Sequence, residues 1–305
     1  MENSLTFEQF CDYFNKESTC IDALFASRWP EGFRCPRCQH AGYYFIRTRT
    51  LPLYECQSCR AQTSIIAGTI MEGSRTPLRL WFQALFLHAQ PNGISALRLS
   101  TLIGTTYKTA WLMCHKIRHA MSSADSKVLL SGIVRINCGV YGRPYNPTIF
   151  RHPQEQPLLI GASLDNEHQV THLKIKQVSD RHLVHDRVTP LGSRLFIRDH
   201  VSPETKDIDT VLLKFSRNRH RQLIQIGEQA SAWMNYIFSG IGPKHLQSYL
   251  DQFCFNVNLR FHPYCFNVLL TYCASFPTLT YPQLTGRMDL SAQRRITYHE
   301  YLRSA

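Results

Sequence analysis

The pattern of apolar and polar positions divides the chain into helical and strand-like regions. Apolar residues recur at helical spacing near the N-terminus, and again through residues 77–121, where breaks at residues 91–93 and at Gly104 separate three helices. Between these regions, residues 33–66 are rich in Cys, Tyr, Arg and Thr and predict short strands. The N-terminal part of the chain is therefore expected to be helical, with one small strand-rich insertion.

The second half of the chain begins with strands and ends with helices. Residues 128–199 alternate apolar runs with turns, and the runs expected to be strands are "VLLSGIVRINCGV", "PLLIGASL", "QVTHLKIKQV" and "SRLFIRD". After Glu204 the spacing becomes helical, at residues 228–238 and 243–258 and more weakly to residue 273. No internal repeat or low-complexity segment stands out, which argues against a solenoid.

The net charge of the chain indicates what kind of partner it binds. The 305 residues carry 34 Lys and Arg against 22 Asp and Glu, a formal net charge of +12. An excess of this size favours a polyanionic partner such as nucleic acid, because binding releases the counterions condensed on it. The alternative is a basic protein whose charges only meet solvent.

The cysteines indicate a reducing compartment. The chain has eleven cysteines, an odd number, and two pairs have the spacing of metal ligands rather than of a disulfide framework. No signal peptide precedes them, and the apolar run "YCFNVLLTYCASF" is broken by Asn267 and closed by Pro277, too short to cross a bilayer. We expect a soluble cytoplasmic protein without a membrane partner.

Two cysteine pairs predict a zinc ribbon. Cys35 and Cys38 form one CxxC knuckle and Cys56 and Cys59 form another, and the seventeen residues between the knuckles suit a β-hairpin. Two knuckles can present four thiolates to one tetrahedral zinc ion, which leaves no open coordination position and so makes the zinc structural. The ribbon also carries arginines that could contact phosphates or form a solvated basic face: Arg37, Arg47, Arg49 and Arg60.

Residues 93–121 predict a helix-turn-helix, with Gly104 supplying the turn. The apolar face of its second helix comprises Tyr107, Ala110, Trp111, Cys114, Ile117 and Met121. The other face comprises Lys108, Thr109, Leu112, His115, Lys116 and His119, and it could enter a DNA major groove. The alternative is a three-helix packing module with a solvated basic face.

These motifs carry a family resemblance. The string "CPRC…YECQSC…TSIIAGTIMEGSRTPLRLWFQALFLHAQPNGISALRLSTLIGTTYKTAWLMCHKIRHAM" closely resembles the N-terminal half of zinc-ribbon DDE transposases of bacterial insertion sequences, the ISXO-type group related to Merlin elements. The likeness continues through "LIGASL", "RLFIRDH", "GPKHLQSYLDQFCFNVNLRF" and "LTYPQLT". It covers nearly the whole chain.

The resemblance implies an α/β multi-domain protein, in which an N-terminal zinc ribbon and helix-turn-helix precede an RNase H-like α/β domain with C-terminal helices. The expected domains are N-terminal helices at residues 1–32, the zinc ribbon at 33–76, the helix-turn-helix at 77–124, a degenerate RNase H-like domain at 125–285 and a C-terminal tail at 286–305. In such families two Asp and one Glu hold two divalent ions, for which magnesium is suited, and the ions drive attack on a phosphodiester.

The family's catalytic acids carry over unevenly. Asp199, at the end of the expected strand "RLFIRD", matches the second Asp by position. The first Asp should end the strand "GIVRINCGVYG", where this sequence has Asn137. Glu228 is the best candidate for the third acid by helical context. The remaining nearby acids are expected to be solvated charges in a loop after Asp199: Glu204, Asp207 and Asp209.

The substitution at residue 137 predicts a decayed nuclease centre. An amide keeps the shape of the acid but loses the negative charge that offsets the repulsion between two divalent cations. Arg135, expected on the opposite face of the strand, replaces an acid, and Cys138 is a poor magnesium ligand. Magnesium binding is therefore doubtful. The alternative is a shifted register in which Asp165 or another acid substitutes.

The sequence thus predicts a DNA-binding protein of transposase descent, which recognises double-stranded, transposon-end-like DNA and is impaired in catalysis. One alternative is an active transposase that cleaves and joins DNA with metal ions, and another is a protein-interaction scaffold. The resemblance further implies a homo-oligomer in the bacterial cytoplasm, associated with the nucleoid.

Overall fold

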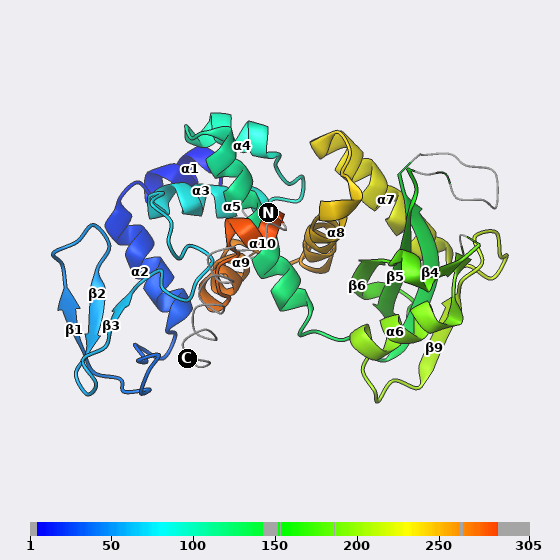
Figure 1. Ribbon diagram of the computed structural model, residues 1–305, viewed down its shortest axis with the longest axis horizontal. Helices are drawn as coiled ribbons and strands as arrows, with labels where there is room; N and C mark the ends of the chain where they lie inside the picture. The colour runs from blue at the N-terminus through cyan, green and yellow to red at the C-terminus, as the bar shows by residue number, and fades with distance from the viewer. Residues whose placement is uncertain (1–4, 143–151, 153, 186, 263–264, 286–305) are drawn as a thin grey trace, which may run out of the picture.

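The computed structural model describes residues 5–142, 152, 154–185, 187–262 and 265–285 (Figure 1). The chain folds into two lobes. One contains the small sheet β1–β3 and most of the helices, and the other contains the large sheet with α6, α7 and α8 (Figure 1). None of the helices in these residues is long and apolar enough to cross a membrane.

The first lobe is mainly helical, as its apolar spacing predicts. Its elements up to residue 125 are α1 (Phe7–Tyr13), α2 (Glu17–Arg28), β1 (Tyr43–Ile46), β2 (Leu53–Cys56), β3 (Gln62–Ser64), α3 (Leu78–His88), α4 (Ala96–Ile103) and α5 (Tyr107–Asp125). One hydrophobic core joins them, since Phe10, Leu24, Tyr54, Trp81 and Ile117 belong to the same buried cluster. The expected units at 1–32, 33–76 and 77–124 therefore share a core.

A tight turn connects α4 to α5. Ser95 caps α4 with its side chain, and the helix ends at Gly104, whose φ of 66° places it in the left-handed region that glycine adopts without steric cost. Thr106 then caps α5 by accepting a hydrogen bond from the N–H of Thr109. The sequence therefore sets both helix ends and the turn locally.

The second lobe is built on a four-stranded sheet. Its strands are β4 (Ile133–Tyr141), β5 (Gln156–Leu164), β6 (Val170–Gln177) and β9 (Asp207–Val211), in the order β6-β5-β4-β9. β4, β5 and β6 form an antiparallel meander, and β9 returns to lie parallel to β4. In this register Asn137 lies opposite Val211.

Helices cover both faces of the large sheet. α7 (Arg221–Phe238) and α8 (Pro243–Asn258) pack on the face that carries Ile160 and Leu173. α6 (Pro190–His200) packs on the other face, where Phe196 joins Val134 in a second cluster. The fit is close, because a Cβ at Gly161 would lie 2.8 Å from the Phe196 ring.

Residues 190–200 form a helix, so the prediction of a strand ending at Asp199 is wrong. Thr189 caps α6 by accepting a hydrogen bond from Gly192 N–H, and Pro190 occupies the first turn, where its missing N–H costs nothing. The buried positions Gly192, Ser193 and Phe196 follow helical spacing. Before this helix, the chain forms a 3-10 turn, Asp180–His182, and a small hairpin of β7 (Leu183–Val184) and β8 (Arg187–Val188).

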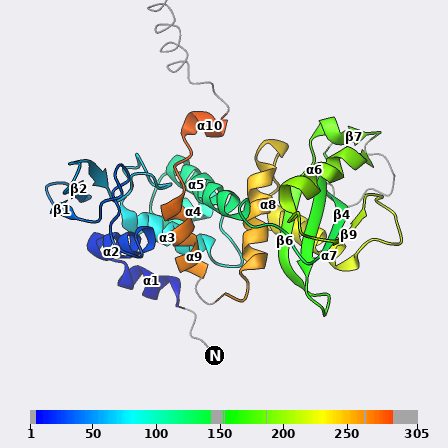
Figure 2. The same ribbon diagram turned by 90° about the horizontal axis from the view of Figure 1, so that it is seen from below.

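The two lobes meet where α5 packs against α8, which lies between α5 and the sheet in both views (Figures 1 and 2). Arg118 of α5 is 1% exposed, donates from Nε to Oε1 of Gln252 at 2.7 Å, and lies 3.8 Å above the Tyr249 ring. At the end of α5, the Asp125 carboxylate accepts hydrogen bonds from Lys174 at 2.9 Å and Lys176 at 3.0 Å, both on β6. Buried polar contacts thus join the lobes.

The last helices return to the first lobe. α9 (Cys265–Ser275) adds Leu269, Leu270 and Cys273 to the core of that lobe, and α10 (Tyr281–Thr285) follows it. The backbone N–H of Ile70 donates to the carbonyl of Cys273 at 3.1 Å. The expected unit at 125–285 therefore does not share one core, and the expected tail at 286–305 lies outside the described residues.

Candidate metal centre and DNA-binding surfaces

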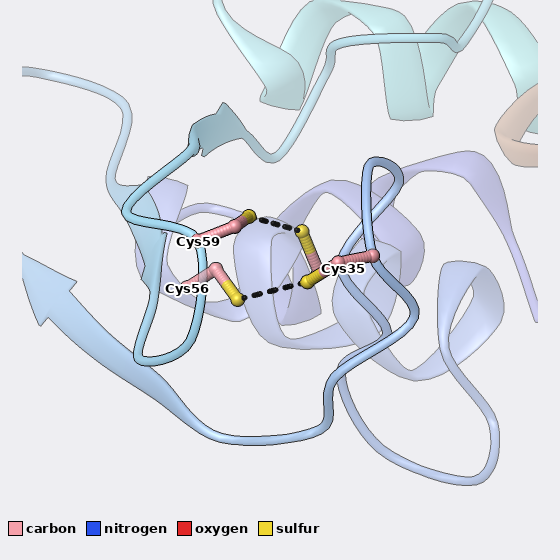
Figure 3. Close-up of side chains that lie close together, drawn as sticks. Cys35, Cys56 and Cys59 are labelled. Atoms are coloured by element: carbon pink, nitrogen blue, oxygen red, sulfur yellow. Dashed lines mark hydrogen bonds between the residues drawn. The ribbon is translucent and has the colours of Figure 1, made fainter.

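The two CxxC knuckles bring four sulfur atoms together. Cys35 Sγ lies 3.6 Å from Cys59 Sγ, and Cys38 Sγ lies 3.5 Å from Cys56 Sγ, with all four atoms within 4.8 Å of one another (Figure 3). A tetrahedral zinc ion with Zn–S bonds of about 2.3 Å needs sulfur atoms about 3.8 Å apart. The cluster therefore has the size of a zinc site, and it is the one such group of His, Cys, Asp and Glu found among the described residues.

The knuckles have matching backbone geometry. In the first, the N–H of Gln39 donates to the carbonyl of Cys35 at 2.9 Å; in the second, the N–H of Arg60 donates to the carbonyl of Cys56 at 3.0 Å. Gln39 and Arg60, each directly after the second cysteine of its knuckle, have φ values of 61° and 59°. This repeated left-handed turn points both cysteines of a knuckle toward the same centre.

Two thiols of this cluster, Cys35 and Cys38, have pKa values shifted in opposite directions. Burial raises the pKa of Cys35, but the backbone N–H groups of Cys38 and Arg37 stabilise its thiolate and bring the pKa down to about 7. The N–H of His40 lowers the pKa of Cys38, yet its contacts with the other three cysteines raise it to about 12. Four adjacent thiolates repel one another, so their joint ionisation calls for a bound cation.

The ribbon exposes basic and aromatic side chains. Arg47 and Arg49 follow β1 and are exposed, and their contact with phosphates stays a prediction. The Arg47 guanidinium lies 5.0 Å from the ring centre of Phe45, and that of Arg60 lies 5.4 Å from the ring centre of Tyr44. Arginine and aromatic side chains thus lie side by side on the exposed surface of the ribbon.

The predicted DNA-facing residues of α5 fall into two groups. Lys108 is exposed in the first turn, and the hydroxyl of Thr109, which is half-buried, lies 2.9 Å from that of Thr106. His115 and Lys116 are 2% and 7% exposed, so the prediction that they face DNA is wrong.

Packing on two sides explains this burial of the middle of α5. The ring centre of His115 lies 4.9 Å from that of His245 in α8, and the ammonium of Lys116 lies 6.0 Å from the ring centre of Trp81 in α3. The exposed side chains of α5 are Tyr107 and Lys108, in its first turn.

Asn137, predicted to replace the first catalytic Asp, has no exposed surface. Its Nδ2 donates to the carbonyl of His220 at 2.9 Å, and its Oδ1 accepts from the N–H of the same residue at 3.3 Å. His220 directly precedes α7. The amide thus fastens the start of α7 to β4.

Among the described residues, the side chain of Asn137 makes its hydrogen bonds to His220 and none to either of the other two predicted acids. Asp199 lies in the last turn of α6, where its carboxylate accepts two hydrogen bonds from Arg198, at 2.7 and 3.1 Å, which lower its pKa. The carbonyl of the next residue, His200, accepts from the N–H of Leu130, which lies before β4 begins and on the order of 20 Å of extended chain from Asn137. Glu228 is exposed on α7, about two turns beyond His220.

Asp207 and Asp209 lie on β9 and not in a loop, which corrects a second expectation. Asp207 accepts two hydrogen bonds from Arg135, at 2.6 and 3.2 Å, and Asp209 Oδ2 lies 3.0 Å from His220 Nε2. Arg135 and Asn137 are two residues apart on β4 and therefore share a face, so the expectation that Arg135 lies on the opposite face is wrong. Each of these acids has a cationic or imidazole neighbour.

Comparisons with known proteins agree with the ribbon. Residues 15–62 match the family model described as the transposase zinc-ribbon domain, of the IS1595 type, and this range includes all four cysteines. Together with the sulfur geometry, the match identifies a structural zinc site. No solved structure matches the chain.

A transposable-element protein provides a second similarity. Over 111 residues the chain is 27% identical to an uncharacterized protein in transposable element ISH50 of Halobacterium salinarum. The alignment covers 36% of this chain and 37% of that relative, so the chain spans little more than a third of its length. The chain is thus related to transposable-element proteins through its zinc ribbon and a limited part of its length.

Proposed function

We propose that this protein binds double-stranded DNA, of the kind found at transposon ends, and does not cleave it. The zinc ribbon and the α4–α5 helix-turn-helix supply the binding surfaces, and the sheet lobe is an RNase H-like domain without a nuclease centre. The observation that carries the proposal is the buried amide of Asn137, hydrogen-bonded on both sides to the backbone of His220.

The binding part rests on the exposed cations of the first lobe. Arg47, Arg49 and Lys108 are exposed on the ribbon and on the first turn of α5. α4, its three-residue turn and α5 have the lengths and caps of a helix-turn-helix, whose second helix reads DNA with its N-terminal residues. The net charge of +12 supports a polyanionic partner.

The loss of cleavage rests on the sheet lobe. An antiparallel meander followed by a strand parallel to its first strand is the arrangement expected for an RNase H-like domain. In such a domain acids on β4 and on the neighbouring parallel strand would hold the metal ions, but here Asn137 faces Val211. A neutral amide and an apolar side chain cannot offset the repulsion between two magnesium ions.

DNA binding is tested by titrating labelled duplex DNA with the full-length protein at several salt concentrations. We expect log K to fall linearly with log salt, by about 0.9 per phosphate contact. Failure to bind duplex DNA even at low salt would favour the protein-interaction scaffold.

Cleavage is tested separately, with pre-cleaved element ends, target DNA and either magnesium or manganese. We expect no joined product. Efficient joining that is abolished by Asp199→Ala would instead establish an active transposase.

A further inference from the structure

The loop between β9 and α7 is strongly basic. Residues 212–227 contain four Lys and Arg side chains and no Asp or Glu, and the four cations are Lys214, Arg217, Arg219 and Arg221. The loop and the first turn of α7 therefore form a positively charged surface on the sheet lobe, which we call the 214–221 surface.

Hydrogen bonds fix this surface to the sheet. Arg219 donates from Nη1 to the carbonyl of Lys214 at 2.8 Å and from Nη2 to the carbonyl of Cys138 at 2.8 Å. The next residue, His220, is held by Asn137 through both of its backbone polar groups. Two consecutive residues of β4 thus fasten the loop, so its cations have a defined place beside the strand.

The acids around this surface are already engaged. Asp209 lies 3.0 Å from His220, Glu155 lies 3.5 Å from Lys214, and Asp207 is hydrogen-bonded to Arg135. Arg217 and Arg221 are exposed. Their charges therefore face outward, available to a partner.

We propose that the 214–221 surface binds the phosphate backbone of duplex DNA, with Arg217 and Arg221 making the contacts. This inference rests on the proposed DNA-binding function and extends it to the sheet lobe. Guanidinium groups match phosphate oxygens in geometry and carry a permanent charge. Cations on this anchored loop would thus hold the DNA backbone beside Asn137, where the family resemblance implies metal ions. Arginines do not activate a water molecule, so the DNA is held without being cleaved.

The test compares two double variants of the full-length protein. Arg217→Ala with Arg221→Ala removes two charges from the surface. Arg187→Ala with Arg194→Ala removes two exposed charges from the α6 side of the same lobe. Both change the net charge equally, and circular dichroism and thermal unfolding check that both fold. Duplex binding is then measured at several salt concentrations.

We expect the first double variant to lower the salt slope by about two and to weaken binding, and the second to leave both near wild type. Replacing Arg217 and Arg221 with Lys should restore most of the slope. Equal losses in the two double variants, or an unchanged first variant, would overturn the assignment of this surface while leaving DNA binding by the ribbon intact. Absence of duplex binding by the wild type would overturn both proposals.

Discussion

The side-chain amide of Asn137 and the backbone of His220 pair as donor and acceptor in both directions, at 2.9 and 3.3 Å. This pairing needs an amide. A carboxylate at residue 137 could still accept the hydrogen bond from the N–H of His220. Its second oxygen, however, has no proton to donate and would repel the carbonyl oxygen of His220. The residue that would serve a nuclease and the residue that secures α7 in this structure are therefore chemically incompatible.

Asn137→Asp should consequently destabilise the protein without creating a nuclease. Leaving the partly buried carbonyl of His220 unpaired next to a buried charge costs about 3 kcal/mol, and thermal unfolding measures that loss. Asn258→Asp is a matched variant, because Asn258 makes the same two hydrogen bonds to Leu173, at 2.8 and 3.1 Å, from a half-buried position. It should cost less, since water can reach it. Magnesium-dependent cleavage by a fully stable Asn137→Asp protein would contradict this interpretation.

Removal of zinc should unfold the ribbon and weaken the first lobe. Cys56 is fully buried and belongs to the same core as Trp29, Phe33 and Tyr54, so its loss as a ligand disrupts that core as well as the metal site. We expect Cys56→Ser to release the bound zinc, as measured by metal analysis. We also expect it to lower the melting temperature of the first lobe, as measured by calorimetry. Cys11→Ser, at a cysteine outside the cluster, is the control and should retain zinc.

Lys108 and Lys116 should behave differently, although both were predicted to face DNA. Lys108→Ala removes an exposed charge and should weaken duplex binding and lower the salt slope by about one, with unchanged stability. Lys116→Ala removes a buried stem packed near Trp81 and should lower the melting temperature while leaving the salt slope of the folded protein unchanged. A lower salt slope for duplex binding by the Lys116 variant would contradict this prediction and would extend the DNA interface to the middle of α5.

Local signals explain what the sequence predicts well. The zinc ligands follow from CxxC spacing. Both ends of α4 and the start of α5 follow from Ser95, Gly104 and Thr106, whose capping hydrogen bonds span three or four residues. The prediction of a strand ending at Asp199 is wrong because the six residues "RLFIRD" fit both the two-residue period of a strand and the 3.6-residue period of a helix. Thr189 and Pro190 are a typical helix start, and this signal decides in favour of the helix.

The errors in α5 concern partners distant in sequence. Nothing within α5 shows that α3 and α8 cover its middle, so His115 and Lys116 resemble a polar face until the tertiary structure is known. Likewise, the anchoring of Arg219 to Cys138 depends on the loop lying beside β4. A basic run free of acids at residues 214–221 was the one sequence signal for that surface.

Two buried histidines should make the protein sensitive to mild acid. Burial, together with the nearby charge of Arg118, lowers the pKa of both His88 and His115 to about 3. In the unfolded chain each histidine has a pKa of about 6.5, so below that value the unfolded state binds more protons than the folded state. Stability must therefore fall with falling pH, by about 2 kcal/mol per histidine between pH 6.5 and 5.

Replacing one of these histidines should remove its contribution to the dependence of stability on pH. His115→Phe keeps an aromatic ring among Trp111, His245 and Tyr249 but has no titrating group, so the loss of stability between pH 6.5 and 5 should shrink by about half of the two-histidine contribution. Urea unfolding at a series of pH values measures this. His168→Asn, at an exposed histidine, should leave the slope as in the wild type. An unaltered slope in His115→Phe would contradict the prediction, because it would mean that His115 binds protons to the same extent in the folded and unfolded states.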